Sequence, residues 1–397
     1  MNEVIKNLKT LGINRIFTGM GYYVTIPLFS IILMNTKNLD TISVGYIMAI
    51  FAFAVKGGSL PLFIFPSLSH NIKKIIMFGT LSASLGLVLV FISNNFYIII
   101  GSVIISGVGI SINILGIQTY ISGNIVEKKS KLKNFTLQIW IANLTAVVGP
   151  LITGFFSHFN IGLSLLLSSF FYLGAFLNSL FYFKAPKVVY ADVFGRFKLK
   201  HLIFIKNLGL DVLFLLAFSM WFVYSQIYFL LPFYISKTLN YGGLINYLLS
   251  FNAITLIALQ GVVTFFITKY FMHSHMLAIA LGFAFICGGY IMFYLQNSVV
   301  WLWVGFFLLS LGELIILPEL DFLVSELVGK FSTTYVFSVY TIFCGIGYGL
   351  SNLIFGKLIE HNIYIALESL AYISIVLSFF SVLLFVKTKY FSKFIKL

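Results

Sequence analysis

Two long apolar stretches follow each other between residues 75 and 121. The first reads IIMFGTLSASLGLVLVFIS (75–93), and after two asparagines the second reads FYIIIGSVIISGVGISINILGIQTYI (96–121). Each is long enough to cross a bilayer as a helix, which needs roughly 20 apolar residues. A strand of a transmembrane barrel would instead alternate polar and apolar residues. The pair therefore predicts two transmembrane helices joined by a short loop.

The same apolar character extends over the whole chain. Of the 397 residues, 60% are hydrophobic and only 9% are charged, whereas soluble domains carry about 25% charged residues. The exterior of a soluble protein of this length would have to be much more polar. The composition excludes a soluble enzyme, a nucleic-acid-binding domain and a disordered chain, and it predicts an all-α integral membrane protein.

Twelve apolar stretches can be placed along the chain, and polar or basic residues separate them. Hydropathy of this kind identifies transmembrane helices. The longest polar segment, residues 184–206, is predicted as a cytoplasmic linker between an N-terminal six-helix bundle (1–183) and a C-terminal one (207–397). The expected helices span residues 11–34, 42–65, 75–93, 96–121, 135–157, 161–183, 208–235, 243–268, 276–295, 299–324, 334–356 and 363–386.

Basic residues predict the orientation of these helices. Most of the 25 lysines and arginines lie at the N-terminus (Arg15 included), in the linker, in the C-terminal tail and in alternate loops, all on one side. Lys37, Lys237 and Lys357 lie on the other side, and Lys56 lies inside the second span. By the positive-inside rule both termini are cytoplasmic, in a multi-pass protein that we expect in the cell membrane, the inner membrane of a bacterium. The net charge of +14 then reflects insertion and anionic lipid rather than nucleic acid.

The two halves carry a weak internal repeat. Pro27 of the first span is matched by Pro232 of the seventh, 205 positions later. Residues 149–154 (GPLITG) are echoed by residues 351–356 (SNLIFG) at nearly the same offset. Parallel six-helix repeats are a transporter architecture in which the substrate site lies between the halves near the middle of the membrane.

With these features the chain resembles the major facilitator superfamily, and within it the 12-helix drug/proton antiporter-type multidrug exporters. Residues 142–150 (ANLTAVVGP), followed by Gly154, look like the glycine-rich antiporter motif of the family's fifth helix. Residues 311–318 (LGELIILP) are similar to a Gly-Glu plus proline signature in the tenth helix of one multidrug branch. The resemblance implies two pseudo-symmetric six-helix bundles and export driven by a proton gradient, with no cofactor.

Gly149, Pro150 and Gly154 also have a physical meaning of their own. Glycines let two transmembrane helices approach closely, and a proline removes a backbone donor and bends its helix. We therefore predict a helix-packing seam at these three residues that slides or closes during transport.

Two family motifs are altered in this chain. The loop between the second and third helices usually reads Gly-x-x-x-Asp-Arg-x-Gly-Arg-Arg, but here Ser69 replaces the aspartate and Ile72 the second glycine. The basic pair survives as Lys73 and Lys74, which the resemblance makes a cytoplasmic gate loop without its usual charge anchor. The arginine of the family's fourth helix is also replaced, at residues 102–103, so proton coupling through it is not expected.

Charged side chains inside the membrane are the strongest functional candidates. At the bilayer centre a charge costs roughly 2.5–3.5 kcal/mol on insertion scales, so such residues are rare and usually functional. Glu313 lies near the middle of the tenth span, where desolvation favours the protonated carboxyl group, and we predict that it carries the coupling proton. The alternative is a protonated side chain that only hydrogen-bonds a neighbouring helix. Lys56 and Asp321 are predicted as a gate or counter-charge, with snorkelling of Lys56 and a vestibule position for Asp321 as the alternatives.

Uncharged polar and aromatic residues supply candidates for a substrate lining. Any one of them is more often a helix-packing hydrogen bond than a ligand contact. An aromatic cavity would suit bulky, amphipathic or cationic compounds. The candidates are Tyr22, Asn113, Asn143, Gln226, Asn252 and Gln260.

The residue pattern favours a transporter over other membrane proteins. The six histidines are scattered, and the sequence holds no zinc-binding spacing, nucleophile elbow or phosphate-binding loop, so neither an enzyme nor a metal site is expected. We predict a monomeric secondary transporter working by alternating access, which exports small amphipathic molecules in exchange for protons. Its partners would be a small-molecule substrate and membrane lipid. Uptake or export of a specific metabolite, and a lipid flippase, remain open alternatives.

Overall fold

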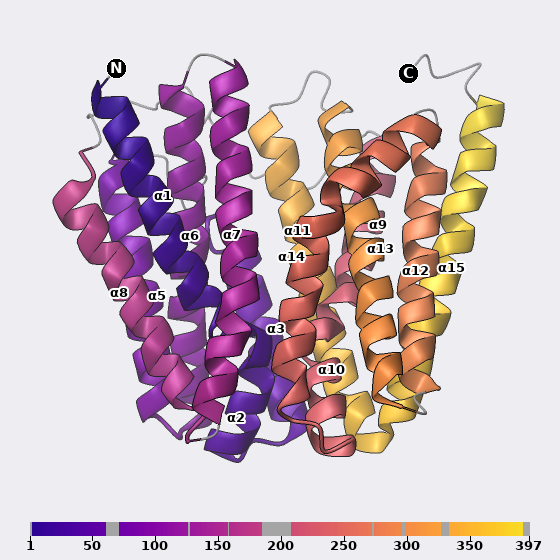
Figure 1. Ribbon diagram of the computed structural model, residues 1–397, viewed down its shortest axis with the longest axis horizontal. Coiled ribbons are helices and arrows are strands. Elements are labelled where there is room, and N and C mark those ends of the chain that lie inside the picture. Colours follow the sequence, from indigo (N-terminus) through magenta and orange to yellow (C-terminus); the bar gives the residue numbers. More distant parts are fainter. Residues whose placement is uncertain are drawn as a thin grey trace.

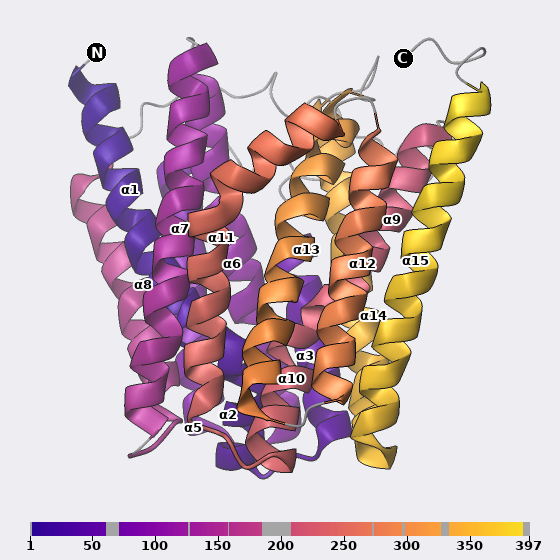
Figure 2. The ribbon, with the colours of Figure 1, turned by 45° about the vertical axis from the view of Figure 1, so that its right-hand side comes forward.

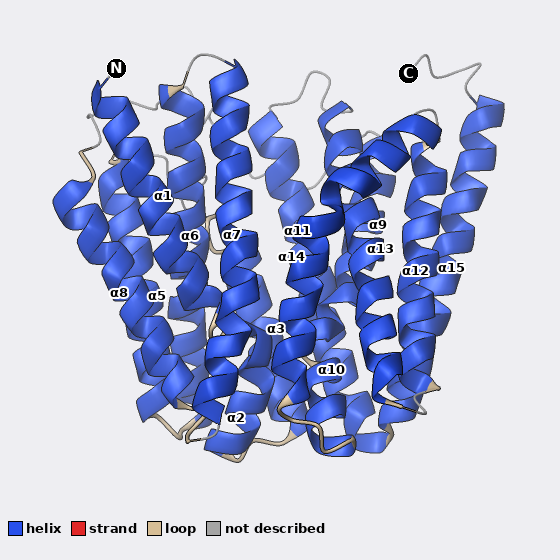
Figure 3. Cartoon of the chain, in the orientation of Figure 1, coloured by secondary structure: helices blue, strands red, loops and turns tan. Residues whose placement is uncertain are grey.

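The computed structural model describes residues 2–60, 71–125, 128–157, 159–184, 208–271, 274–295, 298–326 and 333–391. All regular structure in these ranges is helical (Figure 3), which confirms the predicted all-α fold. Residues 185–206 of the predicted linker, Ser69 of the altered loop motif and residues 61–65 of the predicted second span lie outside the described residues.

Eleven described helical segments are long and apolar enough to cross a membrane, and the shorter apolar helix Thr41–Gly57 completes the twelve predicted spans. In the N-terminal half the elements are α1 (Asn2–Tyr23), the 3-10 helix η1 (Ile26–Leu28), α2 (Phe29–Lys37), α3 (Thr41–Gly57), α5 (Ile72–Ile92), α6 (Phe96–Asn124), α7 (Lys128–Ser157) and α8 (Leu163–Tyr182). In the C-terminal half they are α9 (Leu208–Tyr224), the 3-10 helix η4 (Ser225–Tyr228), α10 (Leu230–Phe233), the π-helix η5 (Tyr234–Thr238), α11 (Leu244–Tyr270), α12 (His275–Tyr294), α13 (Val299–Glu326), α14 (Thr333–His361) and α15 (Ile363–Phe391).

The first span of each half is broken at a related position. In the first span α1 ends at Tyr23, and Pro27 lies in the 3-10 turn that precedes α2. In the seventh span α9 ends at Tyr224, a 3-10 turn follows, and Pro232 lies in the short helix α10. Proline cannot donate to the helical ladder. The predicted sequence repeat is therefore accompanied by a structural one.

The two halves meet along two pairs of helices, α3 with α14 and α7 with α11. Both termini lie at one end of the bundle, and α2 and α10 lie at the other (Figure 1). At this α2/α10 end Lys237 Nζ donates to Asn35 Oδ1 at 2.6 Å, and Ser30 Oγ donates to the Tyr228 carbonyl at 3.3 Å. Figures 1 and 2 both show α7 and α11 diverging from this end towards the end of the termini. The halves are thus joined at the α2/α10 end.

The glycines of the α7 seam lie at close helix contacts. A Cβ atom on Gly149 would stand 2.5 Å from the carbonyl carbon of Tyr23, so the backbones of α1 and α7 are in close contact there. A Cβ on Gly154 would stand 3.0 Å from Nδ2 of Asn246, which belongs to α11 in the other half. Pro150 lies inside α7 between them. The seam therefore packs against its own half and the opposite half, and its sliding in transport stays a prediction.

We expect Gly149→Ala to lower stability. The new methyl group would overlap the Tyr23 backbone and push α1 from α7, and overpacking of this kind typically costs about 1–3 kcal/mol. Thermal unfolding of the purified protein in one detergent measures the change. Gly101→Ala is the matched control, because no atom lies within 4 Å of its Cβ position. Equal unfolding temperatures for the two variants would contradict this contact.

Candidate functional site

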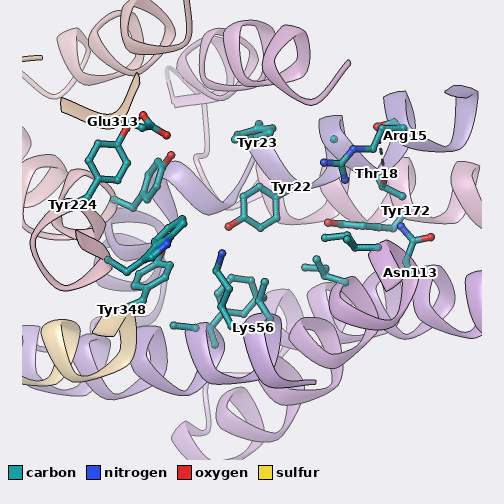
Figure 4. Close-up of a pocket in the computed structure, with 18 residues that line it drawn as sticks. Arg15, Thr18, Tyr22, Tyr23, Lys56, Asn113, Tyr172, Tyr224, Glu313 and Tyr348 are labelled. Carbon is teal, nitrogen blue, oxygen red and sulfur yellow. Dashed lines mark hydrogen bonds between the residues drawn. The ribbon is translucent and has the colours of Figure 1, made fainter. Parts of the chain in front are cut away.

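A cavity of about 220 Å³ lies between the two halves. Its wall is formed by α1, α3, α6 and α8 from the N-terminal half and by α9, η4, α13 and α14 from the C-terminal half. Figure 4 shows the side chains that converge on it. The wall consists of Arg15, Thr18, Gly19, Tyr22, Tyr23, Phe51, Ala52, Val55, Lys56, Ile110, Asn113, Ile114, Tyr172, Trp221, Tyr224, Tyr228, Glu313 and Tyr348.

One face of α1 supplies a large share of this wall. Arg15, Thr18, Gly19 and Tyr22 are spaced at i, i+3, i+4 and i+7, which places them on the same side of a helix. Arg15 corrects the sequence analysis, because it was counted with the cytoplasmic N-terminus and instead faces the cavity. The i, i+3, i+4, i+7 spacing with Tyr22 was the signal that could have identified it.

Glu313 lies at one end of the cavity, on the middle of α13. Its carboxyl group accepts a hydrogen bond from the hydroxyl of Tyr224. Nδ2 of Asn252 donates to that hydroxyl at 3.4 Å and to Ser310 Oγ at 2.8 Å. Among the described residues the one ion pair joins His275 and Glu319, so Glu313 has no cationic partner there. The single carboxyl group of the wall is held by hydrogen bonds alone and is free of a counter-charge.

Lys56 enters the cavity from the last turn of α3. Its Nζ lies 3.9 Å from the centroid of the Trp221 ring, and Trp221 stacks on Tyr348 with ring centroids 6.0 Å apart. A cation over an indole face is attracted by the ring quadrupole, and more strongly where water is excluded. Lys56 was expected near the centre of the second span, but α3 ends at Gly57. Its ammonium group is held by an aromatic pair instead of an acid.

Arg15 lies at the end of the cavity opposite Glu313, beside Tyr172 and Asn113 (Figure 4). Its Nε donates to the Gln138 carbonyl of α7 at 3.4 Å. Among the described residues its guanidinium group has no carboxylate within ion-pair distance. Arg15 therefore keeps donors available for a ligand.

Three polar atoms of the wall have no hydrogen-bond partner within the described chain. They are Oδ1 of Asn113, the hydroxyl of Tyr172 and the hydroxyl of Tyr348. Buried polar groups are normally paired, since an unmade hydrogen bond there costs free energy. These three atoms are therefore available to hydrogen-bond a ligand or water.

Four of the predicted lining residues lie outside the wall, which corrects their assignment. Nε2 of Gln226 donates to Ser351 Oγ at 2.7 Å and to Asn352 Oδ1 at 3.1 Å, so it joins the seventh span to α14. Nδ2 of Asn252 donates a hydrogen bond to the hydroxyl of Tyr224, and Asn252 itself lies outside the wall. Asn143 is half-buried on α7, and Gln260 is exposed on α11. Of the predicted lining, Tyr22 and Asn113 do reach the cavity.

The predicted gate residues also take other positions. Asp321 is exposed on α13 outside the wall, in contact with Tyr340 and within electrostatic range of Lys56. Lys73 and Lys74 belong to the first turn of α5 and not to a loop. Nζ of Lys73 donates to the Leu180 carbonyl of α8 at 2.7 Å, a contact inside the N-terminal half. These positions join neither lysine to the opposite half.

The chemistry of the cavity is that of a binding site. Six tyrosines, a tryptophan, two cations and one carboxyl group face a small enclosed volume. Among the described residues no three His, Cys, Asp or Glu side chains are grouped so that they could hold a metal ion. The wall offers stacking surfaces, hydrogen-bond donors and acceptors, and one carboxyl group.

Comparisons with known proteins were made for both the sequence and the fold. The family model described as Major Facilitator Superfamily matches residues 11–352. No curated protein sequence matches the chain. A POT family transporter solved with 5-aminolevulinic acid superposes with a TM-score of 0.79 at 15% identity, covering 96% of both chains. A mutant of the nucleoside transporter NupG superposes with a TM-score of 0.74 at 12% identity, covering 94% of this chain and 98% of that one. At these identities the likeness concerns the fold.

Proposed function

This chain belongs to the Major Facilitator Superfamily, and we propose that it is a proton-coupled secondary transporter of small amphipathic organic molecules. Members of this family are membrane transporters and not enzymes. The proton and the substrate class are inferred from the cavity, and the direction of transport is inferred from the resemblance of residues 142–150 to an antiporter motif.

The observation that carries the proposal is the position of Glu313. Among the described residues that line the cavity between the halves, it is the only one with a carboxyl group. A coupling carboxyl group must be reached from each side in turn and must be able to exist without a proton. The hydrogen bond from Tyr224 supports the ionised form, and the missing counter-charge leaves the protonated form accessible. Glu313 therefore meets the requirements for loading and releasing a proton.

Alternating access follows from the way in which the halves are joined. Hydrogen bonds and glycine contacts hold them together at the α2/α10 end, which the charge distribution predicts to be periplasmic. Rocking the halves about the cavity would open that end and close the other. Glu313, bound to Tyr224 of its own half, would keep its local partner during the movement.

Export is the direction we propose, on the resemblance of residues 142–150 to the antiporter motif. The alternative is uptake or export of one specific metabolite, and the two half-buried basic side chains of the wall, Arg15 and Lys56, favour it because they would select for charge. Structural neighbours include a peptide transporter and a nucleoside transporter. A lipid flippase is the second alternative.

Inside-out vesicles with an imposed pH gradient provide the test. A panel of neutral, cationic and anionic aromatic compounds is added one at a time, and a pH-sensitive dye records gradient dissipation. We expect at least one compound to dissipate the gradient in vesicles that contain the protein, and none to do so in vesicles that lack it. Transport of a radiolabelled compound that is identical with and without the pH gradient would contradict proton coupling.

A further inference from the structure

We propose that the cavity binds a small aromatic anion, with its acidic group held by Arg15 and Lys56 and its ring lying among the tyrosines. This inference names the substrate class of the same cavity, and its role in transport rests on the proposed function. It departs from the sequence-based expectation, which allowed cationic compounds, because the structure places Arg15 in the wall.

The charges of the wall carry the first step of the argument. Two basic side chains and one carboxyl group line the cavity, and within the described chain neither basic group has an acidic partner at ion-pair distance. Burying a charge without a partner is costly. An anion that enters the cavity would supply the partner that Arg15 and Lys56 lack. A cationic substrate would meet two like charges and is disfavoured.

The placement of these charges sets the second step. Arg15 and Lys56 both belong to the N-terminal half, on α1 and α3, whereas Glu313 belongs to the C-terminal half. Figure 4 shows Glu313 with Tyr224 at one end, Arg15 at the other, and Tyr22 and Lys56 between them. The acidic group of a ligand held near Arg15 and Lys56 is therefore kept apart from the Glu313 carboxylate, which would repel it.

The geometry of the two cations favours an oxyanion. The planar guanidinium of Arg15 can bind a carboxylate or phosphate through two parallel hydrogen bonds. The ammonium group of Lys56 is held by the face of Trp221 and not by a hydrogen-bonding acid, so its three donors remain usable. Carboxylates and phosphate monoesters share this recognition chemistry.

Aromatic side chains and unpartnered hydroxyls define the rest of the ligand. Tyr22 and Tyr23 meet edge to face at 5.1 Å, and Trp221 stacks on Tyr348, which provides surfaces for a planar group. The unpartnered atoms of Asn113 and Tyr172 lie at the Arg15 end (Figure 4). They would hydrogen-bond polar groups placed next to the acid. An aryl or arylalkyl acid fits this combination.

Equilibrium binding to the purified protein in lipid nanodiscs tests the proposal without any gradient. Three probes share one skeleton and differ in charge: 3-phenylpropanoate, 3-phenylpropanamide and 3-phenylpropylamine. We expect the carboxylate to bind at least about tenfold more tightly than the amide, the size of effect given by one charge-assisted hydrogen bond. The amine should bind more weakly than the amide. Phenyl phosphate separates the two oxyanions, because tighter binding than the carboxylate would identify a phosphate monoester site.

Variants locate the site. Arg15→Gln and Lys56→Gln should each remove most of the preference for the carboxylate over the amide. Lys269→Gln should keep it, because Lys269 lies over Phe265 and Tyr270 of its own helix, outside the wall. Arg15→Lys keeps the charge but not the two parallel bonds, so an intermediate preference would show that Arg15 acts directly even if Arg15→Gln folds poorly.

Several outcomes would overturn the anion site. These are a preference for the amine, no binding of either oxyanion, or an unchanged preference in both Arg15→Gln and Lys56→Gln. Proton coupling is judged separately, because binding is measured without a gradient. Anion binding with no proton flux in vesicles would contradict the proposed function alone, whereas proton flux driven only by cations would contradict the anion site alone.

Discussion

Glu313→Gln is expected to abolish accumulation of substrate against its gradient while leaving exchange of substrate across the membrane intact. Glutamine keeps the size and hydrogen-bonding capacity of the protonated side chain but cannot release a proton. A gradient of one pH unit stores about 1.4 kcal/mol per proton, which supports up to about tenfold accumulation in one-for-one exchange. We expect this ratio in the wild type and a ratio near one in the variant.

Two measurements on proteoliposomes check this result, both made with the compound that responds most strongly in the vesicle panel. Accumulation under an imposed pH gradient reports coupling, and exchange of labelled for unlabelled compound at equal pH reports movement of the halves. Glu319→Gln is the matched control on the same helix, because Glu319 pairs with His275 at 2.6 Å outside the cavity wall. Accumulation that survives in Glu313→Gln would move the coupling site elsewhere.

Tyr224→Phe should show whether the hydrogen bond to Glu313 matters for coupling. The hydroxyl donates to the Glu313 carboxylate and is itself supported by Asn252. Removing one hydrogen bond to a charged group typically costs about 1.5–3 kcal/mol, so we expect a fall of about tenfold or more in the pH-driven rate. Exchange at equal pH should fall much less. Equal losses in both assays would indicate a structural role for Tyr224.

The sequence predicted the fold well because long apolar runs have few solutions in a bilayer. Run length identified the spans, and Pro27 and Pro232, which were noted as a repeat, lie where the first and seventh spans are broken. The second span was predicted to end at residue 65; α3 ends at Gly57, and residues 61–65 lie outside the described part of the chain, so this boundary stays a prediction.

The cavity was predicted only in part, and charge explains the difference. Glu313 and Lys56 stood out because charges within a span are rare, and both lie in the wall. Arg15 was missed because a basic residue near a terminus is expected from insertion alone. Gln226 was placed in the lining because it falls on the pattern of the family that the chain resembles, but its amide is bonded to Ser351 and Asn352. Which partner an amide finds depends on how helices distant in the sequence pack together, here the seventh span and α14 of the same half, and the residues around the amide do not reveal this packing.

A bulky residue at Gly45 should prevent the halves from closing at the α2/α10 end. Gly45 lies near the start of α3, and a Cβ atom there would stand 2.7 Å from the Asn352 carbonyl oxygen and 3.2 Å from the Cα of Gly356, both on α14. The obstacle is backbone, which cannot rotate away as a side chain can. Gly45→Leu would therefore force α3 from α14 and favour conformations that are open at this end.

We expect transport by Gly45→Leu to fall at least about tenfold, because moving an equilibrium by about 1.4 kcal/mol already changes the population tenfold and overpacking typically costs about 1–3 kcal/mol. Spin labels at Tyr97 and Tyr241, which are 80% and 43% exposed and belong to opposite halves, would report the opening as a longer distance distribution. Gly101→Leu is the control, since nothing lies within 4 Å of its Cβ position. An unchanged distance together with lost transport would mean that Gly45 acts on the substrate path and not on closure. An increase in distance with lost transport would establish that contact between α3 and α14 backbones closes this end, and that alternating access in this chain depends on a position where only glycine fits.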